Sequence, residues 1–265
     1  MQSEDGRVQA RENEIRVLRA LHRFGWLRTR DLAALAWQRW ARSPTNEPGL
    51  KPPMSTASGL RMAQRTLKRL REKRQVLRSQ APDGSLIYAL AEAGARALKQ
   101  IGVAAVTGKD QARSFSSAHY RHRCISNEIA VGAIVEGFRV ATEREIAQGL
   151  WLGGDNGVAG KKPDVLLRGH GQVWWVEVER SRKNGKDYAG LLKWIGMVGR
   201  DAFRQSGPEL LSDGLRWGKV LFVCTTAFRD RLCRDLVAAG WKKIHIDTLI
   251  SFEVSLYKFE DISFT

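Results

Sequence analysis

Three acidic side chains in the second half of the chain have the types and spacing that could do chemistry. Asp164 follows a proline, and Glu177 and Glu179 lie two residues apart in an apolar run. Side chains alternate along a strand, so Glu177 and Glu179 project from one face, and a hairpin pairing brings Asp164 beside them. Carboxylates gathered on an apolar sheet repel one another, and a hard divalent cation is the simplest compensation. The pattern predicts a site for Mg²⁺ or Mn²⁺, with surface ion pairs to Arg180, Arg182 and Lys183 as the alternative.

The elements around these acids predict an α/β domain with a mixed central sheet. Apolar periodicity predicts helices over residues 117–138, 187–203 and 228–239. It predicts extended segments over 139–141, 164–168, 173–179, 219–225, 243–246 and 253–259.

The Pro-Asp step and the acid pair resemble the signature of the PD-(D/E)XK nuclease superfamily. That signature is an Asp after Pro, followed on the neighbouring strand by an acid two residues before a Lys. Glu179 stands where the Lys would be. The resemblance implies cleavage of DNA as a nick or a double-strand cut, with Asp164 and Glu177 holding the metal and Glu179 orienting or deprotonating water.

The same resemblance implies further site residues. Glu143 or Glu128 would be an outer metal ligand. Lys183 would stabilise charge in the transition state, and Lys161 or Lys162 are the other candidates for that positive charge.

A basic helix in the first half of the chain is the second candidate site. Over residues 58–74, apolar residues recur on one side of the predicted helix, while Arg61, Arg65 and Lys68 fall on the other. Such a helix suits the major groove, where Arg reads guanine edges and both side chain types neutralise phosphates. The alternative is a solvated surface helix with an incidental basic face. The predicted DNA-binding residues are Arg61, Arg65, Lys68, Arg69 and Arg78.

The order of elements before residue 105 predicts a winged helix-turn-helix. A helix over 12–24 ends at Gly25, and a second begins at Thr29 as N-cap. After a Pro-rich loop over 38–58 and the basic helix, Pro82-Asp83-Gly84 predicts a hairpin turn, and a helix over 91–101 closes the domain. We therefore expect a DNA-binding winged helix over 1–105, a linker over 106–116 and a nuclease-like domain over 117–265.

Most of the chain resembles the replication-relaxation family of plasmids and integrative elements. The likeness rests on a winged helix, a helix bearing His122 and Asn127, an extended acidic segment over 142–145, Pro-Asp, and a strand ending Glu-Val-Glu-Arg. The family's usual ending is Glu-Leu-Asp-Arg. The resemblance implies a role in replication or conjugative mobilisation of a mobile element, as a relaxase-like nickase.

The charge balance points to a polyanionic partner. Lys and Arg total 44 against 28 for Asp and Glu, and 21 basic against 10 acidic residues occur up to Asp110. We expect double-stranded DNA as the partner, with replication or mobilisation proteins and a homodimer left open. No apolar run is long enough to span a membrane and the polar N-terminus lacks a signal-peptide core, so we expect no membrane association and a cytoplasmic location.

Two other classes of function remain open. A non-catalytic DNA-binding accessory or transcription factor would carry a degenerate nuclease-like domain. A plain repressor would bind its operator fully through residues 1–105 alone. The three widely spaced cysteines form no metal-binding pattern and are expected to be free thiols.

Overall fold

The computed structural model describes residues 6–110, 117–179, 184–212 and 214–254, and the chain forms two compact units. The first unit contains the described residues up to 42 together with 51–136. The second contains 43–50 together with those from 137 onward. The second domain, expected from the sequence to begin at residue 117, begins later along the chain, because the helix α6 (Ser117–Val135) belongs to the first unit.

The first unit combines helices with a small antiparallel sheet. Its strands are ordered β1-β3-β2, and the hairpin β2–β3 turns at Gly84, whose φ of 76° favours glycine. In chain order, its elements are α1 (Gly6–Phe24), β1 (Trp26–Arg28), α2 (Thr29–Trp37), α3 (Ala57–Glu72), β2 (Val76–Gln80), β3 (Leu86–Leu90), α4 (Glu92–Lys99) and α6.

Most of these elements lie where the sequence predicts them. The helix α1 buries Val17, Leu21 and Phe24 on one face and ends at Gly25. The predicted N-cap at Thr29 is wrong by one residue: Arg28, whose backbone is extended, is the N-cap of α2, and its N–H donates to the Asp31 carboxylate. The strand β1 was not predicted.

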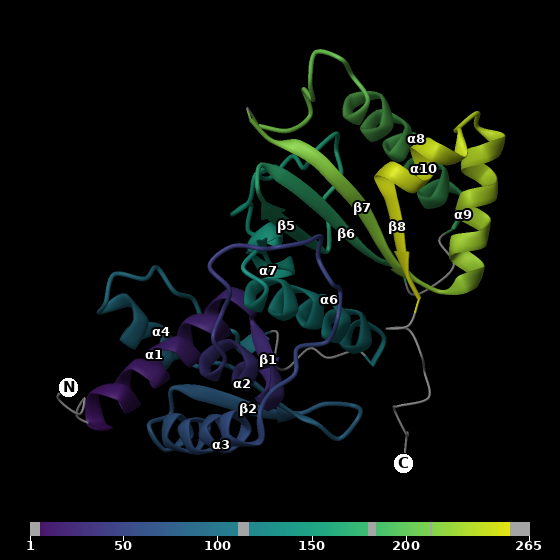
Figure 1. Ribbon diagram of the computed structural model, residues 1–265. Helices are drawn as coiled ribbons and strands as arrows, with labels where there is room; N and C mark the ends of the chain where they lie inside the picture. The colour runs from purple at the N-terminus through teal and green to yellow at the C-terminus, as the bar shows by residue number, and fades with distance from the viewer. Residues whose placement is uncertain (1–5, 111–116, 180–183, 213, 255–265) are drawn as a thin grey trace. The chain divides into compact units, whose positions relative to one another are not determined.

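The second unit is α/β with a mixed five-stranded sheet, as expected (Figure 1). Its strands are ordered β4-β5-β6-β7-β8; the pairings among the first three are antiparallel and the other two are parallel. In chain order, its elements are β4 (Arg139–Ala141), α7 (Glu143–Ala147), β5 (Val165–Gly169), β6 (Gln172–Glu179), α8 (Gly185–Ala202), β7 (Arg216–Cys224), α9 (Thr226–Ala238), α10 (Lys243–Leu249) and β8 (Ile250–Glu253).

The core of the second unit lies on one face of this sheet. Trp175 of β6 is fully buried, and its ring contacts those of Trp194 on α8 and Trp217 on β7, with centroids 4.7 and 6.3 Å apart. Buried residues of α9 and α10 join the same cluster. Because side chains alternate, Glu177 and Glu179 lie on this face too, at the end of β6.

Three expectations for the second unit need correction. Residues 243–246 are helical, within α10, and the predicted extended segment 142–145 is a helix start, in which Thr142 and Glu145 form a capping box for α7. The strand near this end is β8, over Ile250–Glu253, so it shares only Glu253 with the strand expected over 253–259; residues 255–259 lie outside the described residues.

Two further properties follow from the described residues. The cysteines are free, with Cys124 and Cys224 buried and Cys233 half-buried. Among the helices of this part of the chain, none has the length and apolar character needed to cross a bilayer.

Candidate nucleic-acid interface and carboxylate site

The basic stripe of α3 faces solvent. The hydroxyl of Thr56 caps the helix by accepting from the N–H of Gly59 at 3.0 Å, and the apolar side of the helix is buried. Arg61, Arg65 and Lys68 are exposed, and within the described residues none of them has an ion-pair partner. These three cations are therefore available to a polyanion, as DNA binding requires.

The other two predicted DNA-binding residues differ from one another. Arg69 is half-buried, and its Nε lies 3.2 Å from Oε1 of Glu14 on α1, whose Oε2 lies 2.7 Å from Nζ of Lys73. Arg69 thus holds α3 to α1, a role that the sequence reasoning missed. Arg78 is exposed on the hairpin strand β2, where its backbone lies opposite that of Tyr88 of β3.

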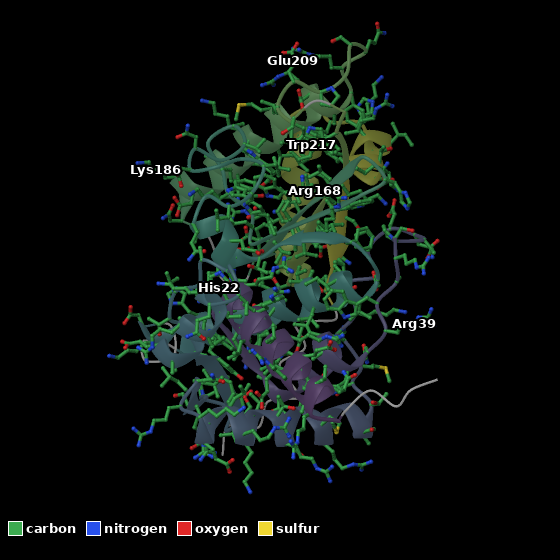
Figure 2. All side chains as sticks on the ribbon, turned by 90° about the vertical axis from the view of Figure 1, so that its left-hand side faces the viewer. His22, Arg39, Arg168, Lys186, Glu209 and Trp217 are labelled. Atoms are coloured by element: carbon green, nitrogen blue, oxygen red, sulfur yellow. The ribbon has the colours of Figure 1, made fainter. Side chains whose placement is uncertain are left out.

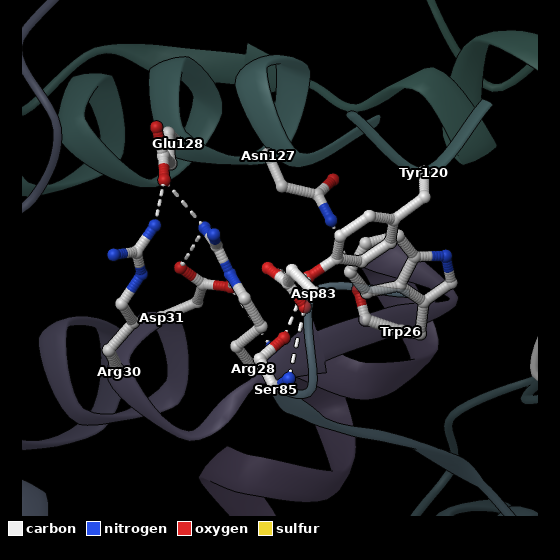
Figure 3. A network of polar contacts seen from close by, with 9 residues as sticks. All are labelled: Trp26, Arg28, Arg30, Asp31, Asp83, Ser85, Tyr120, Asn127 and Glu128. Carbon is white, nitrogen blue, oxygen red and sulfur yellow. Dashed lines mark hydrogen bonds and ion pairs between the residues drawn. The ribbon is translucent and has the colours of Figure 1, made fainter. Parts of the chain in front are cut away.

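A buried arginine, Arg28, joins the start of α2 to α6 (Figure 3). Its Nε and one terminal nitrogen each lie 2.9 Å from an oxygen of Asp31, and that terminal nitrogen also lies 2.8 Å from Oε1 of Glu128. Arg30 forms a second ion pair with Glu128. A buried guanidinium needs such partners, because charge removed from water is costly unless it is paired.

A second contact ties the hairpin turn to α6. The phenol of Tyr120 lies 2.9 Å from an oxygen of Asp83 and 2.7 Å from the hydroxyl of Ser85, and its ring stacks on Trp26 at 5.5 Å (Figure 3). Burial disfavours the Asp83 carboxylate, but hydrogen bonds from Ser85 and Tyr120 lower its pKa below the ordinary value. On the same helix, Asn127 donates to the backbone carbonyl of Trp26 at 3.1 Å. These contacts explain why α6 belongs to the first unit.

In the second unit, Asp164 lies near Glu177. It directly precedes β5, whose Val165 pairs with Val176, and the N–H of Asp164 donates to the carbonyl of Val176 at 3.0 Å. Its carboxylate is close enough to raise the pKa of Glu177. Oδ2 of Asp164 accepts from the N–H of Val178 at 2.7 Å. The structure therefore brings together two of the three predicted acids.

The carboxylate of Glu177 is buried with two donors. Nζ of Lys161 lies 2.5 Å from one of its oxygens, and the indole N–H of Trp175 donates to the other at 2.5 Å. Lys161 also lies over the ring of Trp194, 5.6 Å from its centroid. Burial raises the pKa of Glu177 to about 7; Lys161 opposes this shift, and the Asp164 carboxylate adds to it. Of the two candidates for the missing positive charge that the structure describes, Lys161 and Lys162, it is Lys161 that contacts Glu177.

Glu179 is buried two residues beyond Glu177 on β6, opposite Cys224 of β7. Burial raises the pKa of the Cys224 thiol to about 12, and the negative charge of Glu179 adds to the shift. Glu179 therefore lies on the predicted face, beside a protonated thiol.

The remaining predicted site residues lie on other elements or outside the described residues. Glu143 begins α7, Glu128 is in the first unit and pairs with arginines, and Lys183 lies outside the described residues. Within the described ranges, no three His, Cys, Asp or Glu side chains gather closely enough to hold a metal ion. Among the described residues, the positive charge at Glu177 comes from Lys161.

No family model, curated protein or solved structure matches this chain. The resemblance to the replication-relaxation family therefore stays a prediction from the sequence, and the function rests on the geometry.

Replacing Tyr120 with Phe should destabilise the protein by about 1–2 kcal/mol, because a buried hydrogen-bonding group is lost while the partly buried Asp83 carboxylate remains. Urea unfolding of Y120F measures this free energy. Tyr88→Phe is the matched control, since the Tyr88 hydroxyl has no hydrogen-bond partner among the described residues. Equal stability of the two variants would contradict the role of Tyr120.

Glu177 should make stability depend on pH. The pKa of Glu177 in the folded protein is raised above its value in the unfolded chain. Its contribution to the free energy of unfolding is therefore fully present at low pH and is lost as pH rises through about 7. Relative to Glu177→Gln, which cannot titrate, we expect the natural protein to lose on the order of 1–2 kcal/mol between pH 5.5 and 8.5. Urea unfolding of both proteins across this range measures the difference, and parallel pH profiles would disprove it.

Proposed function

We propose that this protein binds double-stranded DNA through α3 and the β2–β3 hairpin, in the manner of a winged helix-turn-helix. The observation that carries the proposal is the exposed stripe of Arg61, Arg65 and Lys68 on a helix whose other side is buried. A helix fits the major groove, and unpaired cations on its outer side can displace the counterions of the phosphates. The hairpin supports the assignment, because it follows α3 directly and carries the exposed Arg78.

We assign the second unit to the nuclease-like part of a replication or mobilisation protein of a mobile element. Support comes from the motif residues: Asp164, which follows Pro163 and directly precedes β5, lies near Glu177 of β6, with a Lys ammonium at the Glu177 carboxylate. Glu179, which stands where the motif has Lys, favours a DNA-binding accessory or transcription factor with a degenerate nuclease-like unit.

Nicking of DNA with Mg²⁺ or Mn²⁺ is the second candidate function. It is favoured by the proximity of Asp164 to Glu177, which holds two acids of the predicted site close enough to interact electrostatically.

Loss of the α3 cations should weaken binding to duplex DNA. For the double variant Arg61→Ala/Arg65→Ala, we expect about 10- to 100-fold weaker binding and a salt dependence reduced by about two ions, because two phosphate contacts disappear. Fluorescence anisotropy with a labelled 30-base-pair duplex, at several salt concentrations, measures both quantities. The matched control is Arg96→Ala/Lys99→Ala, which removes the same charge from exposed positions on α4. If both double variants bind equally weakly, binding is general electrostatics and α3 has no special role.

Incubation with supercoiled plasmid decides between the nickase and the non-catalytic binder. A nickase should convert the plasmid to open circles with Mg²⁺ or Mn²⁺. Asp164→Asn, which keeps an acceptor for the Val178 N–H, should abolish this conversion. Asp247→Asn, at an exposed position on α10, should not affect it. Supercoiled plasmid that stays intact under conditions where the natural protein binds DNA would leave the non-catalytic function.

A further inference from the structure

The first unit contains a pocket of about 500 Å³ that is separate from the basic stripe of α3. Its apolar part includes Phe24, Leu35 and Ile134. Three arginines of α1, Arg16, Arg19 and Arg23, line the same pocket, and no acidic residue does. A pocket of this size, apolar and basic together, suits an occupant that has both a flat apolar part and negative charge.

The arginines are arranged along one face of α1. Their spacing of three and four residues places them in a row that spans about 10 Å along the helix axis. Arg16 and Arg19 are exposed, and neither has an ion-pair partner within the described residues. Glu14 of the same helix cannot neutralise them, because its two oxygens are engaged by Arg69 and Lys73.

Trp40 forms one wall of the pocket and is held in place. Its indole N–H donates to the carbonyl of Leu35 at 3.0 Å, and the N–H of the next residue, Ala41, donates to the carbonyl of Val135 at 2.9 Å. The side chain is nevertheless 48% exposed, so part of the ring remains accessible. Arg39 and Arg42, which flank Trp40 in the sequence, are exposed and lack an ion-pair partner in the described part of the chain. Arg39 is labelled in Figure 2.

We propose that this pocket binds single-stranded DNA. A base stacks on Trp40 and enters the apolar part of the pocket, while Arg16 and Arg19 contact the phosphates of the same strand. An aromatic platform within a basic groove is the arrangement that binds single strands without sequence preference. Duplex DNA does not fit, because its bases are stacked on one another and offer no free face to the indole. A purely acidic peptide would leave the apolar part of the pocket unfilled.

Fluorescence anisotropy of a labelled twelve-residue oligo-dT, titrated with the full chain, tests the proposal. Stacking on an aromatic side chain contributes about 1–3 kcal/mol per base, which corresponds to about 5- to 150-fold in affinity. We expect Trp40→Leu to weaken binding by at least about fivefold. Trp40→Phe, which keeps an aromatic face, should stay close to the natural protein. Arg19→Ala should also weaken binding, whereas Arg96→Ala, an equal loss of charge on α4, should have a smaller effect.

Duplex binding by the same variants separates this proposal from the function assigned to α3. Trp40→Leu should bind the 30-base-pair duplex as the natural protein does, which also shows that it is folded. Arg61→Ala/Arg65→Ala should bind the duplex more weakly and keep oligo-dT binding.

Two results would overturn the proposal. The first is oligo-dT affinity that is unchanged in Trp40→Leu. The second is polyglutamate that displaces labelled oligo-dT as effectively as unlabelled oligo-dT at equal charge, because the pocket would then recognise negative charge alone.

Discussion

Both units depend on one constraint, which Arg28 illustrates: a charged side chain that is buried must be paired with oppositely charged groups inside the protein. Its guanidinium is buried, and the carboxylates of Asp31 and Glu128 surround it. These partners come from α2 and α6, so compensating one charge fixes the position of two helices. In the second unit, Lys161 meets the buried carboxylate of Glu177 in the same way and fixes the segment before β5 against the sheet.

The same constraint explains where the surplus positive charge lies. Cations that stabilise the fold are paired: Arg28 with two acids, Arg69 and Lys73 with Glu14, and Lys161 with Glu177. The cations of the α3 stripe have no such partners in the described part of the chain, and they are exposed. Part of the net charge of +16 therefore lies on exposed cations that have no ion-pair partner among the described residues. These cations can attract an external polyanion.

Local signals made much of the fold predictable from the sequence. Gly25 ends α1, the Pro82-Asp83-Gly84 turn lies between β2 and β3, and the alternation in β6 places Glu177 and Glu179 on one face. The strand predicted over 243–246 was wrong because Ile244 and Ile246 alternate with polar residues as they would in a strand. In the structure Ile246 and Leu249 are buried at helical spacing, while Ile244 is 66% exposed. The three residues of β1 are too few to show any period.

The candidate sites were less predictable, because long-range contacts determine them. Nothing local distinguishes Lys161 from Lys162 or Lys183 as the partner of Glu177, since the choice depends on how the segment before β5 folds over the sheet. Tyr120 likewise lies 37 residues from Asp83. The arginines that line the α1 pocket did leave a signal in their spacing of three and four residues, but Trp40, which completes the pocket, follows the end of α2 in a segment without regular structure.

The placement of residues 43–50 in the second unit has a consequence for how this architecture can evolve. The chain passes from one unit to the other after residue 42, returns after residue 50, and passes again after residue 136. Two contacts hold residues 43–50 to the rest of the second unit. The ring nitrogen Nε2 of His170 lies 2.6 Å from the carbonyl oxygen of Pro44, and Nζ of Lys219 lies 2.8 Å from the carboxylate of Glu47. Neither unit is one contiguous stretch of the gene, so recombination at a single crossover cannot exchange either of them as a complete cassette.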